Sequence, residues 1–142
     1  MQNNESIHQI YFKGYWREVN KAGLPTFTGV YAVYRCRYDK TTDKVKLIEI
    51  IYIGQADDIR KRHANHDKLT SFKSLLQPGE ELCYSCAEVD SRSLDMVENA
   101  LIFAQKPRLN TELVNSYSHN SVHIKVDGCC ACMKYTDFSI SK

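Results

Sequence analysis

The sequence contains no long apolar run and no block of one charge. No stretch of about 18 apolar residues is present that could cross a bilayer, and the first residues lack the cationic and apolar segments of a secretion signal. We therefore expect a cytoplasmic protein with no membrane partner. The 19 basic and 17 acidic residues leave a net charge of +2, so attraction to nucleic acid would require the cations to gather on one face.

Internal repeats and low-complexity linkers are also absent, so the sequence gives no sign of a boundary between domains. The 142 residues, 43% of them hydrophobic, are enough to build one compact core. We expect a single domain over residues 1–142.

The six cysteines lack the secretory context that would favour a disulfide framework. Cys83 and Cys86 could form half of a zinc site, with the rest supplied by the cysteines at positions 129, 130 and 132. Residues 81–89, however, have the composition of a strand, in which residues three apart point to opposite faces. Reduced cysteines packed as small apolar side chains are the favoured interpretation, and structural zinc is the alternative.

The pattern of β-forming residues predicts an antiparallel hairpin in the first half of the chain. Residues 29–36 and 45–53 are rich in β-branched and aromatic side chains, and the polar segment 39–44 separates them. The preceding residues 1–28 form a polar and aromatic lead-in, in which residues 15–19 favour a short helix.

A helix is expected directly after the hairpin. Asp57 or Asp58 can cap a helix that continues through His66, and a spacing of four places Arg62 and His66 on one face of it. Residues 71–76 favour another short helix before the Pro-Gly pair that follows.

The second half of the chain is expected to continue with a strand and a helix. The strand at 81–89 precedes a helix that Ser91 or Ser93 can cap and that carries Glu98. A further strand is predicted at 122–126, with a paired strand after it.

Several residues lie where these elements would point them toward one site. They are Gly29-Val30-Tyr31, Tyr52-Ile53-Gly54, Arg62 with His66, Glu98, and Asn110 after Pro107. In these residues the chain resembles the GIY-YIG nuclease domain over residues 29–111. Val30 replaces the middle Ile of the first motif, and about 20 residues separate Tyr31 from Tyr52, roughly twice the usual number. The extra residues, 38–46, are either a substrate-contacting finger or an inert protrusion.

The resemblance implies an α+β fold in which a small three-stranded antiparallel sheet is flanked by helices. The nuclease-like core would span about residues 29–111, preceded by the lead-in 1–28. The C-terminal extension, residues 112–142, would add one or two extra strands to this core.

The resemblance also implies a set of catalytic residues. They are Tyr31, Tyr52, Arg62, His66, Glu98 and Asn110. Glu98 would bind a single divalent ion, Mg²⁺ or Mn²⁺, because one carboxylate with phosphate and water suits an ion that keeps much of its hydration shell. Arg62 would stabilise the scissile phosphate, and Tyr31 would take a proton from the attacking water.

The remaining members of the set have supporting roles in this comparison. Tyr52 would orient water or phosphate, His66 would bind phosphate or assist proton transfer, and Asn110 would hold the site through a structural hydrogen bond. Gln55 stands where some repair members of the family have a lysine, which argues against a repair-type enzyme.

The function expected from these residues is metal-dependent hydrolysis of phosphodiester bonds in nucleic acid, with DNA as the expected substrate. Substrate specificity would come from a homodimer or from a separate partner protein. The alternatives are a catalytically weak nucleic-acid-binding module and a zinc-stabilised adaptor.

Overall fold

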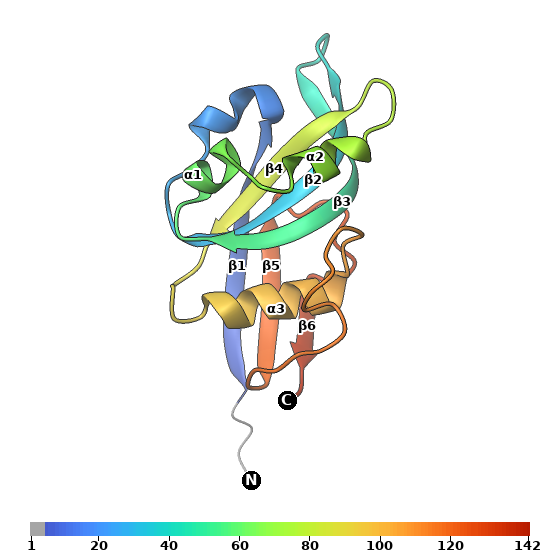
Figure 1. Cartoon of the computed structure of the whole chain (residues 1–142). Helices are drawn as coiled ribbons and strands as arrows, with labels where there is room; N and C mark the ends of the chain where they lie inside the picture. Colours follow the sequence, from blue (N-terminus) through green and yellow to red (C-terminus); the bar gives the residue numbers. More distant parts are fainter. Residues whose placement is uncertain (1–4) are drawn as a thin grey trace.

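The computed structural model describes residues 5–142, and Figure 1 shows its strands and helices. The elements in chain order are β1 (Ser6–Arg17), the 3-10 helix η1 (Glu18–Gly23), β2 (Gly29–Asp39), β3 (Lys44–Ala56), α1 (Ile59–Ala64), α2 (Leu69–Ser74), β4 (Glu81–Glu88), α3 (Leu94–Gln105), β5 (Val122–Gly128) and β6 (Asp137–Ile140). Within the described residues, no helix has the length and apolar character needed to cross a membrane.

All six strands belong to one mixed sheet. Its order is β3-β2-β4-β1-β5-β6, and every neighbouring pair is antiparallel except β1 and β5. Strand β1 pairs with β5 through its first half, Ser6 to Phe12, and with β4 through its second half, Lys13 to Arg17. A register shift between Gly14 and Trp16 lies in the second half, and the sheet curls along β1 between its upper and lower parts in Figure 1.

The expected fold, a small three-stranded antiparallel sheet flanked by helices, is wrong. Residues 6–17 of the lead-in form a strand between β4 and β5, so the short helix expected over 15–19 begins only at Glu18, as the 3-10 helix η1. Residues 1–4 lie outside the described part. Strand β1 therefore pairs with the edge that β4 would otherwise leave open. The strand predicted at 122–126 and its paired strand are confirmed as β5 and β6, but they join the same six-stranded sheet through β1.

The hairpin of β2 and β3 forms as the residue pattern predicts. Its register places Gly29 opposite Ala56 and Tyr31 opposite Gly54, so the two glycine-tyrosine motifs lie side by side. Strand β2 also pairs with β4 and is buried on both faces, which explains its almost continuous run of apolar residues.

Two apolar cores lie on opposite faces of β2 and β4. Alternate residues of β2, such as Val30 and Tyr34, pack with α3, β5 and β6. The residues between them, such as Tyr31 and Val33, pack with α1 and α2 on the other face. The candidate site draws on both layers, because Tyr31 lies in one core and Glu98 is carried by the helix of the other.

Candidate functional site

The glycines of both motifs lie where the chain approaches a neighbour too closely for a side chain. A Cβ added at Gly54 would overlap the phenol oxygen and Cζ of Tyr31. A Cβ added at Gly29 would overlap the carbonyl oxygen of Ala87 on β4. Gly54 therefore allows the ring of Tyr31 to lie across β3, and Gly29 allows β2 to pair tightly with β4.

Tyr31 and His66 form a buried pair. The hydroxyl oxygen of Tyr31 lies 2.7 Å from Nε2 of His66, and Nδ1 of His66 accepts a hydrogen bond from the backbone N–H of Lys68 at 3.0 Å. Since Nδ1 acts as an acceptor, the proton of the neutral imidazole is on Nε2. His66 therefore donates to the oxygen of Tyr31.

Burial keeps both members of this pair neutral. Desolvation, reinforced by the charge of Arg62, lowers the pKa of His66 to about 4. Desolvation also raises the pKa of Tyr31 far above its usual range, because it outweighs the opposing effect of Arg62. Tyr31 can therefore accept a hydrogen bond from His66 and donate its own proton.

The spacing of four predicted that Arg62 and His66 lie on one helical face, and this prediction is wrong. Asp58 caps α1 as expected, through a 3.0 Å hydrogen bond from the N–H of Lys61. The helix ends at Ala64, however, because Asn65 leaves the helical conformation with φ −148° and ψ 64°. The turn after α1, closed by the bond from Lys68 to His66, still brings the imidazole back to Tyr31.

Arg62 lies at the edge of this pair, near the phenol of Tyr31. Its guanidinium makes an ion pair with Asp67 at 2.8 Å, and the side chain is about one-third exposed, at 34%. The charge of Arg62 is permanent, but a phosphate would have to share it with Asp67.

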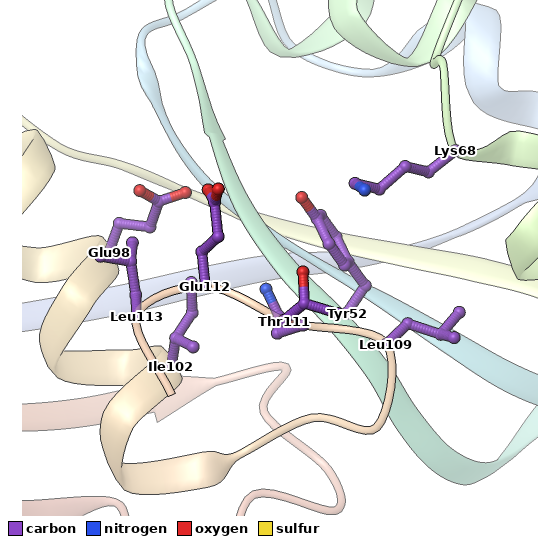
Figure 2. A pocket seen from close by; sticks show the side chains of 9 residues that line it. Tyr52, Lys68, Glu98, Ile102, Leu109, Thr111, Glu112 and Leu113 are labelled. Carbon is purple, nitrogen blue, oxygen red and sulfur yellow. The ribbon is translucent and has the colours of Figure 1, made fainter. Parts of the chain in front are cut away.

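Tyr52 connects the buried pair to an open cavity. Its ring centroid lies 6.3 Å from that of Tyr31 and 5.9 Å from that of His66. Its hydroxyl points into a cavity of about 210 Å³ that Glu98, Asn110 and Lys68 also line (Figure 2).

Glu98 projects into the same cavity from α3. Its Oε1 accepts a 2.9 Å hydrogen bond from Nε2 of Gln55, which also donates to Oδ1 of Asp95 at 2.8 Å. Burial raises the pKa of Glu98, with smaller contributions from Asp95 and Glu112, and the bond from Gln55 opposes this shift. Gln55 therefore holds the carboxylate of Glu98 in place.

The residues around Glu98 fit a magnesium ion better than a fully caged metal. No group of three or more His, Cys, Asp or Glu side chains in residues 5–142 is arranged to enclose a metal. Mg²⁺ needs only one or two protein carboxylates, with water and substrate phosphate as further ligands. Oε2 of Glu98 makes no hydrogen bond within the described residues, and in Figure 2 the carboxylate lies beside that of Glu112.

Asn110 holds the loop after α3 against the hairpin. Its Nδ2 donates to the carbonyl of Ile53 at 2.9 Å, and its Oδ1 accepts from the N–H of Ile53 at 3.0 Å. The adjacent Leu109 donates its N–H to the carbonyl of Ile51 at 3.0 Å. The amide of Asn110 thus makes two backbone hydrogen bonds, an arrangement suited to positioning and not to chemistry.

Three neighbours of the site were not singled out from the sequence. Lys68 and Glu112 line the cavity, each two residues beyond a motif residue. His63 is buried between Tyr31 and Tyr84, with ring centroids 4.4 Å from each, and neither of its nitrogens has a hydrogen-bond partner. Only their short distance from motif residues along the chain could have drawn attention to them.

The cysteines of β4 do not face one another. Cys83 packs in the core that contains α3, whereas Cys86 packs in the core on the opposite face of the sheet. Residues three apart in this strand therefore point apart, and Cys83 and Cys86 cannot be two ligands of one zinc ion.

The residues named from the sequence thus gather around one cavity and the buried pair behind it. No family model, curated protein or solved structure matches this chain. The functional argument therefore rests on these side chains and their geometry.

Proposed function

We propose that the protein is a metal-dependent endonuclease of the GIY-YIG type, which hydrolyses phosphodiester bonds in DNA. The observation that carries this proposal is the shared cavity of Glu98 and Tyr52, directly in front of Tyr31, His66 and Arg62. Glu98 and Tyr52 line the cavity itself, and the rings of Tyr31 and His66 lie next to Tyr52, with Arg62 beside Tyr31.

Each of these side chains would have its own role in the reaction. Glu98 would hold a single Mg²⁺ or Mn²⁺ ion through Oε2, and such an ion supplies charge stabilisation and an acidified water. Arg62 donates hydrogen bonds from its guanidinium to the scissile phosphate, while the same guanidinium stays paired with Asp67. Tyr52, which lines the cavity, orients the phosphate or water, and Tyr31, fixed by His66, supports the ring of Tyr52 from behind.

We further propose that the whole chain works as one unit in the cytoplasm. All six cysteines are free, which is typical of reducing compartments. Sequence or structure specificity would come from a homodimer or from a separate partner protein.

A second candidate function is a nucleic-acid-binding module with little catalytic power. Two observations favour it: Arg62 is already paired with Asp67, and burial keeps Tyr31 protonated. Cleavage assays separate this candidate from the nuclease, because both would bind nucleic acid.

A nuclease assay with the Glu98→Gln variant tests the proposal. Purified protein with Mg²⁺ or Mn²⁺ should nick plasmid, single-stranded or branched DNA, and Glu98→Gln should lower the rate by about 10²-fold or more, because the ion loses its carboxylate. Thermal unfolding should change little, since the new amide oxygen can still accept from Gln55.

The matched control is Glu88→Gln, which removes an exposed carboxylate outside the cavity. It should cleave like the wild type. Equal cleavage by the Glu98 variant and the wild type would remove the metal assignment.

A further inference from the structure

Lys68 stands at the junction of the buried pair and the cavity. It immediately precedes α2, and its backbone N–H makes the 3.0 Å hydrogen bond to Nδ1 of His66. Its side chain extends toward Tyr52, and the ammonium lies 6.0 Å from the centroid of that ring. Figure 2 shows it pointing into the cavity, toward the hydroxyl of Tyr52.

The charge of Lys68 is not neutralised by a carboxylate. Among the described residues no Asp or Glu makes an ion pair with its ammonium, whereas Arg62 is paired with Asp67 at 2.8 Å. Other arginines near the sheet, such as Arg35, are paired with glutamates as well. Lys68 lines the cavity and Arg62 does not, so a phosphate that enters the cavity meets a cation that no carboxylate of residues 5–142 has already paired.

The cavity has two walls of opposite charge. The carboxylates of Glu98 and Glu112 lie on one side, the ammonium of Lys68 on the other, and the hydroxyl of Tyr52 between them (Figure 2). A phosphodiester could turn one non-bridging oxygen toward a metal ion on Glu98. Its second non-bridging oxygen would then face the hydroxyl and the ammonium.

We propose that Lys68 is a substrate-binding residue of this site, which holds a phosphodiester oxygen of the nucleic acid together with the hydroxyl of Tyr52. This inference rests on the proposed function, because it assumes that nucleic acid is the ligand. It adds a residue to which the sequence motifs give no role. Lys68 would then fix His66 through its backbone and bind substrate through its side chain.

The substitution Lys68→Met separates these two contributions. It removes the ammonium but keeps the aliphatic stem over Tyr52 and the backbone N–H that bonds His66. Lys68→Arg keeps the charge. Lys73→Met is the matched control, because Lys73 is an exposed lysine of α2 that does not line the cavity.

Binding of a short fluorescein-labelled DNA, single-stranded and duplex, is measured by anisotropy without divalent metal, over a series of salt concentrations. Lys68→Met should weaken binding by about three- to ten-fold and reduce the slope of log affinity against log salt by about 1, since one phosphate contact is lost. Lys68→Arg should retain most of the affinity, and Lys73→Met should match the wild type. In cleavage assays with Mg²⁺ the loss in Lys68→Met should appear mainly as a higher KM.

Equal affinity and equal salt slope in Lys68→Met and Lys73→Met would overturn the assignment, as would failure of the wild type to bind either DNA. Failure of the proposed function looks different: the wild type binds DNA but does not cut it with Mg²⁺ or Mn²⁺. In that case selective weakening by Lys68→Met would still support the binding role.

Discussion

Tyr31, His63 and His66 form a small group of neutral rings behind the cavity. His66 has a partner on each nitrogen, whereas His63 has none and lies in the apolar core beside Tyr84. Burial lowers the pKa of His63 to about 3, with a further contribution from His66. The two histidines therefore differ in what they contribute: one fixes Tyr31, and the other is a polar ring in an apolar position.

We expect His63→Phe to stabilise the fold. Two buried nitrogens without partners cost free energy that an apolar ring of similar shape avoids, so the free energy of unfolding should rise by about 1 kcal/mol. Urea unfolding measures this change, and His63→Leu, measured alongside, guards against overpacking by the larger ring. A loss of stability in both variants would mean that the imidazole has a partner in solution.

Stability should fall as the pH drops below neutral. A histidine whose folded pKa lies below the unfolded value contributes fully above that value, about 6.5, and loses its contribution as the pH falls toward the folded pKa. His63, with a folded pKa of about 3, should lower the free energy of unfolding by about 1.4 kcal/mol per pH unit below 6.5, and His66, with a folded pKa of about 4, should add a similar slope. Urea midpoints at pH 7.5 and 5 test this, and the slope should be shallower in His63→Phe.

Among the elements, the hairpin and β1 show what the sequence could and could not predict. The hairpin and β4 follow from their β-forming composition and the polar or Pro-Gly segments beside them, and α3 follows from its helical spacing. Strand β1 was missed because its neighbours β4 and β5 are far away in the sequence, and its pairing changes partner near Gly14. An element whose two halves pair with different strands has no single local pattern to reveal it.

Part of the candidate site could also be predicted from the sequence, and part could not. The motif residues were identifiable because each falls in or beside a local element, and Tyr31 opposite Gly54 follows from the hairpin register. The bond from Gln55 to Glu98 and the ammonium of Lys68 over Tyr52 depend on how α3 and the α1–α2 loop pack. No pattern along the chain encodes those contacts.

The close approach of Gly54 to Tyr31 gives a test of the hairpin. Gly54→Ala should lower the free energy of unfolding by about 1–3 kcal/mol, because the new methyl group overlaps the phenol and forces the ring or β3 to move. The same substitution in a Tyr31→Ala background should cost much less, since the overlapping ring is gone. Equal costs in the two backgrounds, measured by urea unfolding, would show that the two residues do not meet.

On the scale of the whole molecule, the two parts of the sheet share the core beneath α3. Helix α3 packs against β2 and β3 of the hairpin and against β5. Its last residue, Gln105, accepts hydrogen bonds from the N–H groups of Lys134 and Tyr135. The position of Glu98 relative to Tyr52 therefore depends on the C-terminal segment as well as on the residues that carry the motifs.

Strand β3 is an outer strand of the sheet, and the loop after α3 covers part of its free edge. Asn110 takes up both backbone groups of Ile53, and Leu109 takes up the carbonyl of Ile51. An incoming peptide strand would find these groups already bonded, so the edge beside the cavity resists strand addition and the aggregation that follows from it. A second copy of the chain therefore cannot pair a strand with β3 at these residues, and the loop after α3 keeps its place beside the cavity.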